Sequence, residues 1–255
     1  HPSEFLRPDS PTPLLMSPRG KASNLLGLGI HHVVLQLFDD AFAQIEAKDF
    51  LAHLQTCVPK LKSVSVGRNF QFGRGRSGDA DFLAGNGPDA GVRVDVSSPV
   101  LHLDEPVSSS RVRRCLASGD LAAVNAMLGR HYEVSGGVES GEGRGAGLGF
   151  PTLNLAWDPG AKPRFGVYAV HLHAEGSQSP CLGVANYGVR PTFDEAAATP
   201  VMETHLFEAP EIKAGDSIRV ELISFLRDEC RFETVEALKE QIAKDKQAAV
   251  QVLAG

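Results

Sequence analysis

The pattern of apolar and polar positions divides the chain into two parts. Up to about residue 130, runs typical of strands alternate with segments of helical spacing. The strand-like runs cover 33–38, 63–66 and 92–96, and the helical segments cover 41–54, 109–116 and 120–128. Because strands and helices that follow each other in turn build a parallel sheet covered on both faces, residues 1–130 are predicted to form an α/β domain.

The pattern of apolar and polar positions changes after Arg130. Short alternating strands recur between glycine and proline residues, at 165–173, 181–184, 203–207 and 218–225. Such strands are typical of a small closed antiparallel barrel. A last helix is expected from Thr234 as its N-cap, with Val235, Leu238 and Ile242 on the buried side. The pattern therefore predicts an α/β domain over residues 1–130 and an all-β domain over 131–255, with the boundary at 129–133.

Composition and charge narrow the function classes. The chain has 255 residues, of which 42% are apolar and 22% charged, as in an average globular protein. No apolar run approaches the roughly 20 residues that cross a bilayer, so no membrane partner is expected. Residues 1–130 hold 14 basic and 13 acidic side chains, whereas the remainder holds 11 and 18. A second half with this excess of acid would repel a phosphate backbone, so no nucleic acid partner is expected.

The cysteines and the first residues of the chain indicate the cellular compartment in which the protein is expected. Cys57, Cys115, Cys181 and Cys230 lie far apart without a CxxC pair, which predicts neither a disulfide framework nor a cysteine zinc site. A reducing cytoplasm is therefore the expected location. The chain starts at His1 with a proline-rich stretch and no secretory pattern, so we expect that it is cut at its start.

The glycine-rich segment 135–154, SGGVESGEGRGAGLGFPTLN, is the strongest chemical signal. Its glycines leave backbone N–H groups open to an anion, and those expected to approach ATP are Gly141, Gly143, Gly145 and Gly149. A linker is the alternative, but a linker would not be expected to end in the strand start PTLNL. Thr152 and Asn154 point the same way in an extended segment, and two neutral oxygen ligands beside phosphates suit Mg²⁺. The segment predicts an ATP and Mg²⁺ site.

Other candidates are weaker. Glu203 lies in a β-favouring strand, where it is either a catalytic base or a solvated face residue. The stretch 73–78, GRGRSG, matches GxGxxG, but Gly85, Gly87 and Pro88 follow it closely, so a basic loop is favoured over a dinucleotide site. His171 and His173 share a strand face and could be half of a metal site, but the sequence shows no third ligand, so a structural role is expected.

Residues 131–255 resemble the riboflavin kinase module of bacterial bifunctional riboflavin kinase/FMN adenylyltransferases. The matching segments, in family order, are GFPTLNL at 149–155, FGVYAV at 165–170, GVANYGVRPTF at 183–193, ETHLF at 203–207 and FLRDECRFETVEALKEQIAKD at 225–245. The resemblance implies a six-stranded Greek-key barrel, with Thr152 and Asn154 on Mg-ATP and Glu203 activating the riboflavin 5′-hydroxyl. It implies a flavin-side position for Arg227.

Residues 1–130 are similar to the Rossmann-like nucleotidyltransferase domain of the same enzymes. The matching segments are HPSEFLRPD at 1–9, VGRNFQFGRGRSGD at 66–79 and VSSSRVRRCLASGD at 107–120. The resemblance places Asn69 at a flavin-side loop. It places Ser109, Ser110 and Arg113 near ATP phosphates, at a helix N-terminus that favours anions.

The family's HxGH motif is absent from these 255 residues. The domain is therefore expected to be incomplete, with FMN adenylylation impaired, unless residues upstream of His1 exist. Three hypotheses follow. The chain is a riboflavin kinase that uses ATP, Mg²⁺ and riboflavin to make FMN, a flavin-binding module without catalysis, or a fully bifunctional enzyme. The oligomeric state is left open.

Overall fold

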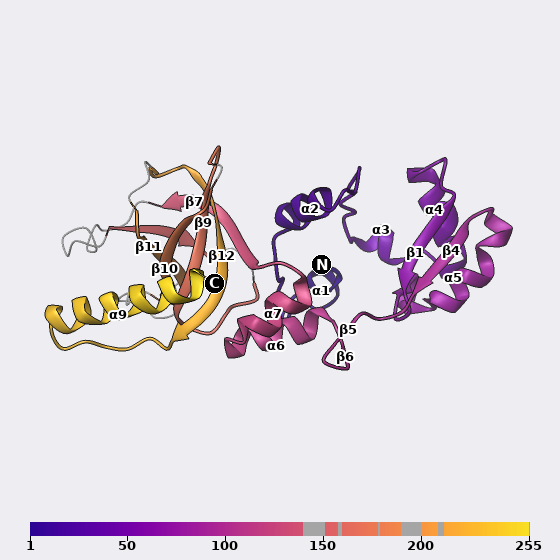
Figure 1. Ribbon diagram of the computed structural model, residues 1–255. Coiled ribbons are helices and arrows are strands. Elements are labelled where there is room, and N and C mark those ends of the chain that lie inside the picture. Colours follow the sequence, from indigo (N-terminus) through magenta and orange to yellow (C-terminus); the bar gives the residue numbers. More distant parts are fainter. Residues whose placement is uncertain (140–150, 158–159, 178, 190–199, 209–211, 255) are drawn as a thin grey trace. The chain divides into compact units, whose positions relative to one another are not determined.

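The computed structural model describes residues 1–139, 151–157, 160–177, 179–189, 200–208 and 212–254. The chain forms two compact units. The first comprises His1–Thr12 and Val34–Val107, and the second comprises Pro13–Val33 and Ser108–Gly255. In Figure 1 the first unit is drawn mostly in indigo and purple, and the second contains the pink to yellow barrel.

The first unit is a small α/β structure. Its helices are α1 (Pro2–Leu6), α3 (Asp40–Ala43), α4 (Phe50–Cys57) and α5 (Ala80–Asn86). Its strands are β1 (Ser63–Gly67), β2 (Gln71–Phe72), β3 (Gly78–Asp79), β4 (Arg93–Ser97), β5 (Leu101–His102) and β6 (Glu105–Pro106). β1 and β4 pair in parallel, as the alternation of strand and helix predicts. The core beside them joins Leu51, Leu83 and Val92 to Phe72.

Two expectations for this region are wrong. Residues 33–38 form no strand, and Val34, Leu35 and Leu37 are 59–74% exposed. A strand needs a neighbour to pair its N–H and C=O groups, and in the described structure no strand pairs with this run. The single helix expected over 41–54 is instead α3, a 3₁₀ turn at Ala47–Asp49 and α4. Asp39 caps the first of these, accepting from Phe42 N at 2.9 Å.

The second unit is built around a closed six-stranded antiparallel barrel. Its strands are β7 (Tyr132–Glu139), β8 (Thr152–Ala156), β9 (Gly166–Ala174), β10 (Cys181–Val189), β11 (Pro200–Leu206) and β12 (Ser217–Arg227). They follow one another around the barrel in the order β10-β11-β8-β7-β12-β9. β9, β10 and β11 are successive neighbours and β12 returns beside β9, which is the Greek-key arrangement that the resemblance implies.

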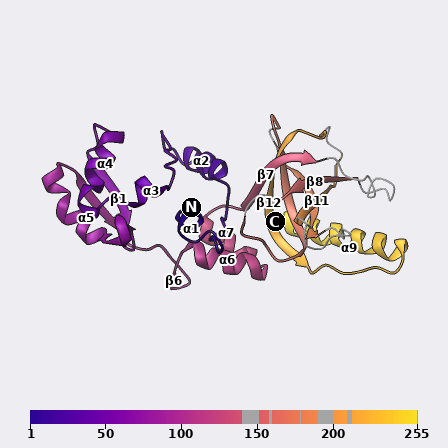
Figure 2. The same cartoon turned by 180° about the vertical axis from the view of Figure 1, so that it is seen from behind.

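The barrel interior is filled by alternate strand residues. Tyr168, Tyr187, Met202 and Leu222 are fully buried, as expected for positions of period two on a closed sheet. On the outer face Val167, Ala169 and Val184 pack against Ala249 of α9 (Val235–Leu253). Figures 1 and 2 show α9 lying along the outside of the barrel. The barrel is therefore apolar inside and, under α9, outside as well.

Helix α9 begins as predicted, and Leu238 and Ile242 lie on its inward side as expected, but Val235 does not. Thr234 caps it by accepting from Ala237 N at 3.1 Å. Val235 is 47% exposed, contrary to the expectation that it is buried, whereas Asp245 and Ala249 are buried. Leu238, Ile242, Asp245 and Ala249 form one stripe at helical spacing, so the inward face of the helix includes a carboxylate.

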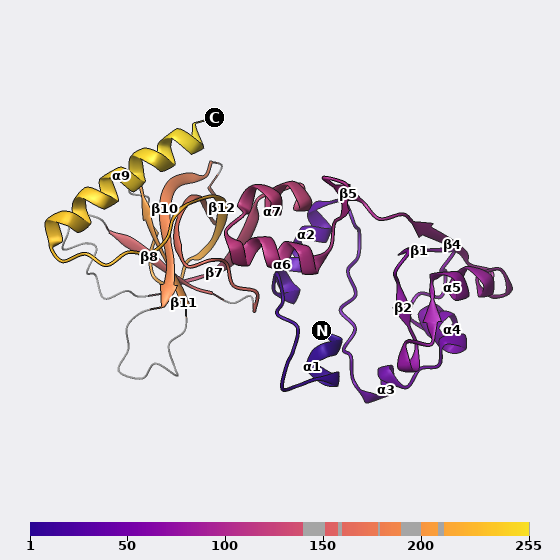
Figure 3. The same ribbon diagram turned by 90° about the horizontal axis from the view of Figure 1, so that it is seen from below.

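Three further helices belong to the second unit: α2 (Pro18–Gly27), α6 (Ser109–Ser118) and α7 (Leu121–Leu128). Asn125 ties α7 to the barrel, because its amide donates to Leu222 O at 3.2 Å and its oxygen accepts from Tyr132 N at 2.8 Å. Figure 3 shows α6 and α7 beside the end of the barrel at which β7 begins. The compact units thus divide elsewhere than at 129–133, and the assignment of activities to residues 1–130 and 131–255 stays a prediction.

Candidate active site

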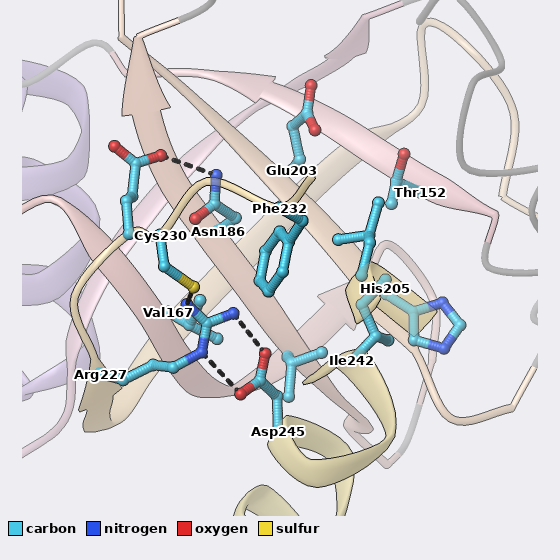
Figure 4. A pocket seen from close by; sticks show the side chains of 13 residues that line it. Thr152, Val167, Asn186, Glu203, His205, Arg227, Cys230, Phe232, Ile242 and Asp245 are labelled. Atoms are coloured by element: carbon cyan, nitrogen blue, oxygen red, sulfur yellow. Dashed lines mark hydrogen bonds and ion pairs between the residues drawn. The ribbon is translucent and has the colours of Figure 1, made fainter. Parts of the chain in front are cut away.

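A pocket of about 340 Å³ lies on the outer face of the barrel, where α9 and the segment before it cover the strands. Its lining comprises Thr152, Val167, Val184, Asn186, Glu203, His205, Arg227, Glu229, Cys230, Phe232, Leu238, Ile242 and Asp245. Figure 4 shows these side chains converging from the strands and from α9. Three residues singled out in the sequence, Thr152, Glu203 and Arg227, line it together.

Strand register explains why polar groups gather here. Asn154 of β8 pairs with Glu203 of β11, and Glu203 pairs with Asn186 of β10. Cross-strand partners point to the same face of a sheet. Their chain neighbours Leu155, Met202 and Tyr187 face the barrel interior. The polar row is therefore outside the barrel.

Thr152 adds an oxygen to this row. It is two residues before Asn154 on β8, so both side chains leave the same face, as expected from the sequence. Asn154 is only 3% exposed, whereas Thr152 and Glu203 are half-buried. In Figure 4 the hydroxyl of Thr152 and the carboxylate of Glu203 point to the same side of the pocket. The row brings together a hydroxyl, a carboxamide and a carboxylate.

This set of donors fits Mg²⁺. Oxygen atoms are the ligands that this hard cation prefers, and it binds through a few protein oxygens while phosphates and water complete its shell. His205 of β11 is a nearby residue that carries nitrogen instead of oxygen, and its Nδ1 lies 3.1 Å from Pro151 O. A buried carboxamide next to a carboxylate is thus chemically suited to a cation that arrives with a nucleotide.

Arg227 anchors the opposite wall. It makes a bidentate ion pair with Asp245 of α9, with Nε–Oδ1 at 2.8 Å and Nη2–Oδ2 at 2.7 Å. This hydrogen-bonded pairing raises the pKa of the Arg227 guanidinium. Arg227 Nη1 also donates to Asp228 O at 2.8 Å. Its guanidinium is thus held between the end of β12 and α9, as Figure 4 shows.

A second contact holds the segment that follows β12. Asn186 Nδ2 donates to Glu229 Oε1 at 3.1 Å. This approach needs Gly188, because a Cβ there would lie 2.1 Å from Glu229 Oε1. Sequence reasoning did not single out Asn186, Glu229 or Asp245 individually, although all three lie in the segments 183–193 and 225–245 that carry the family resemblance. The signal available for Asp245 was a carboxylate within the apolar stripe of α9.

The remaining predicted residues lie elsewhere. Gly141, Gly143, Gly145 and Gly149 are outside the described residues. Ser109 and Ser110 are exposed in the first turn of α6, which Ser108 caps by accepting from Arg111 N at 3.3 Å. Arg113 donates from Nε to Pro13 O at 2.6 Å. Asn69 follows β1 in the first unit, whereas the other three belong to the second.

Comparison with known proteins decides the family. A family model described as riboflavin kinase matches residues 128–253, and one described as FAD synthetase matches residues 1–111. The bifunctional riboflavin kinase/FMN adenylyltransferase of Escherichia coli strain K12 is 34% identical over 248 residues, which are 97% of this chain and 78% of that protein. The chain belongs to this family. It carries a riboflavin kinase domain, within a bifunctional riboflavin kinase/FAD synthetase.

A further relative agrees with this family, and a solved structure shares the fold. The bifunctional riboflavin kinase/FMN adenylyltransferase of Bacillus subtilis strain 168 is 30% identical over 253 residues, covering 98% of this chain and 79% of that protein. A crystal structure described as a macrolide-efflux protein from Streptococcus pneumoniae has a TM-score of 0.85 at 24% identity, covering 98% of this chain and 80% of that one. At this identity the second likeness concerns the fold alone. No helix among the described residues combines the length and apolar composition that a membrane span requires.

In the riboflavin kinase domain, the pairing of Arg227 with Asp245 is expected to hold α9 over the pocket. Replacing Asp245, which is 6% exposed, by alanine leaves a partly buried guanidinium without its carboxylate. We expect a loss of about 2 kcal/mol in the free energy of unfolding, since charged hydrogen bonds in partly buried pairs are of this order. Urea denaturation measures it. A double-mutant cycle with Arg227→Met isolates the pair, and a coupling energy near zero would contradict its role.

Proposed function

We propose that the outer-face pocket is where the riboflavin kinase domain transfers the γ-phosphate of ATP to the 5′-hydroxyl of riboflavin. The observation that carries the proposal is the cross-strand pairing of Asn154 with Glu203, with Thr152 on the same face. It sets a carboxylate beside two neutral oxygens suited to a phosphate-bound cation. ATP, riboflavin and FMN are the substrates and product of the family, and Mg²⁺ is the cation that we propose.

Glu203 is proposed as the catalytic base. As the 5′-oxygen attacks the γ-phosphorus, the carboxylate accepts the hydroxyl proton, the new P–O bond forms and the bond to the leaving ADP breaks. Proton removal by a positioned carboxylate typically contributes 10²–10⁴-fold to a rate. Its neighbour Asn186 is held by Glu229, so the base lies beside a fixed side chain.

Thr152 and Asn154 are proposed to hold Mg²⁺. When bound, the ion neutralises charge on the β- and γ-phosphate oxygens. Asn154 is only 3% exposed and leaves the same face of β8 as Thr152, which supports this role. The proposed contribution of Gly141, Gly143, Gly145 and Gly149 is to offer backbone N–H groups to the same phosphates.

Arg227 is proposed to act at the flavin side by shaping the pocket. Its guanidinium is held by Asp245, and Phe232 lies with its ring centre 6.0 Å from the arginine Cζ. Phe232, Leu238 and Ile242 add apolar surface to the lining. An aromatic ring and two aliphatic side chains suit the flat, largely apolar isoalloxazine of riboflavin.

FMN adenylylation is the second candidate activity, favoured by the match of residues 1–111 to the FAD synthetase model. Ser109 and Ser110 in the first turn of α6 are proposed to approach ATP phosphates, since the N-terminus of a helix attracts anions. Arg113 on the same helix is proposed to belong to that site, and Asn69 is proposed to act at a flavin-side position of the first unit.

One experiment tests both activities. The full chain is incubated with riboflavin, Mg²⁺ and ATP labelled at either the γ- or the α-phosphorus. Phosphotransfer is expected to place the γ-label in FMN, and adenylylation is expected to place the α-label in FAD. Riboflavin binding without any labelled flavin would contradict the kinase proposal and support a flavin-binding module instead.

A further inference from the structure

A cluster of histidines and acidic residues lies on the outer face of the barrel, on strands β7, β12 and β9. These three strands are neighbours in the barrel, as Figure 1 shows. Glu221 in the middle of β12 pairs with Glu133 on β7 and with His171 on β9, so the three side chains share one face. His131 immediately precedes β7. None of these residues lines the 340 Å³ pocket.

Three potential metal-ligand atoms converge in this cluster. Glu221 Oε2 lies 3.5 Å from His131 Nδ1 and 3.8 Å from His171 Nδ1. All three atoms lie within 4.8 Å of one another. Two ligands placed about 2.05 Å from a tetrahedral zinc ion are about 3.4 Å apart. Small side-chain rotations would therefore bring the three atoms to bonding distance of one ion.

The other oxygen of Glu221 is held by Arg219. Arg219 Nη1 donates to Glu221 Oε1 at 2.6 Å and to Glu133 Oε2 at 2.8 Å. A carboxylate fixed in this way presents its second oxygen in one direction, which is how carboxylate ligands of metals are commonly oriented. Here Oε2 is the atom that faces His131 and His171.

His173 places a third imidazole in the cluster. Its Nε2 is buried and lies 3.2 Å from Glu221 Oε1. His173 is two residues from His171 on β9, so both rings leave the same face.

We propose that His131, His171 and Glu221 bind a divalent transition-metal ion of the zinc type. Arg130 and Arg219 flank the two glutamates, so excess negative charge does not supply the affinity. Imidazole nitrogen supplies it, and this favours zinc over Mg²⁺ or Ca²⁺, which prefer oxygen. Two histidines and one glutamate leave the fourth tetrahedral position to water or an anion. The ion would join the start of β7 to β9 and β12.

Binding is tested on the full chain after removal of metal ions. Calorimetric titration with Zn²⁺ is expected to give one ion per chain, and Co²⁺ is expected to give the visible absorption of a tetrahedral site. His131→Asn and His171→Asn should each weaken Zn²⁺ binding at least about tenfold, since even indirect changes at metal sites cost 10–100-fold. His31→Asn, an exposed histidine outside the cluster, is the matched control and should bind as the parent does.

Two measurements guard against misfolded variants. Thermal unfolding without metal shows whether each variant keeps the parent Tm, and Zn²⁺ at a hundredfold excess over Kd should raise the parent Tm by about 5 °C or more. In the parent chain itself, Zn²⁺ should protect His131 and His171, but not His31, from diethyl pyrocarbonate. No saturable binding, no protection, or equal affinity in a His131→Asn/His171→Asn double variant would overturn the proposal.

Discussion

Replacing Glu203 by alanine should reduce the rate of FMN formation about 100-fold or more. The carboxylate lies in the pocket between Asn154 and Asn186, on the row where the acceptor hydroxyl is proposed to bind. Removing a positioned base costs about 10²–10⁴-fold in rate. Because Glu203 is half-buried on the outer face and not in the barrel interior, the fold should survive. Steady-state assay of FMN with saturating ATP and Mg²⁺ measures the change.

A glutamine at the same position separates the proton-accepting role from a positioning role. Glu203→Gln keeps the size and hydrogen-bonding capacity of the side chain but cannot take the proton, so the loss should approach that of alanine. Glu208→Ala, which removes an exposed glutamate just beyond β11, is the matched control and should leave kcat within about twofold. Near-normal turnover of Glu203→Gln would remove Glu203 from the chemistry.

A barrel could be predicted from the sequence where its strands alternate clearly, whereas its six-stranded Greek-key form was implied by the family resemblance. In β12 the alternation of Val220 and Leu222 with Arg219 and Glu221 is that of a sheet with one buried face. Residues 33–38 are as apolar as the residues of β12 but form no strand. The difference is pairing, since a β-branched run is stabilised only where another strand takes up its backbone hydrogen bonds. Local pattern carries no information about that neighbour.

From the residue pattern alone the candidate site could be predicted only where its residues are close in sequence, whereas the family resemblance added Glu203 and Arg227. Thr152 and Asn154 share a face because of strand geometry alone. Asn186 and Glu229 are 43 residues apart and meet through barrel closure and the close approach at Gly188. The ligands that the sequence did not indicate beside His171 are His131 and Glu221, and register places Glu221 next to His171 across β9 and β12. Long-range register thus decides both clusters.

Asn154→Leu should abolish FMN formation or raise the Mg²⁺ concentration required for it by at least tenfold. Leucine has the same branching and the same number of side-chain heavy atoms as asparagine, but it is larger and lacks the ligand oxygen, so at a site that is 3% exposed its packing has to be checked separately. Loss of one of the few protein oxygens that hold Mg²⁺ weakens binding of the ion directly. The measurement is the rate as a function of free Mg²⁺ at constant ATP, with the melting temperature as a check on folding.

The Asn154→Asp variant distinguishes loss of the Mg²⁺ ligand from a change in the shape of the side chain. Aspartate keeps an oxygen at the same place and adds charge, so it should retain Mg²⁺-dependent turnover where leucine does not. The added charge faces its cross-strand partner Glu203, and like charges in direct register repel each other. We therefore expect Asn154→Asp to be slower than the parent but to saturate with Mg²⁺. If the leucine variant showed the parent's Mg²⁺ titration, Asn154 could not be a ligand, and the cation would have to be held by other oxygens of the pocket.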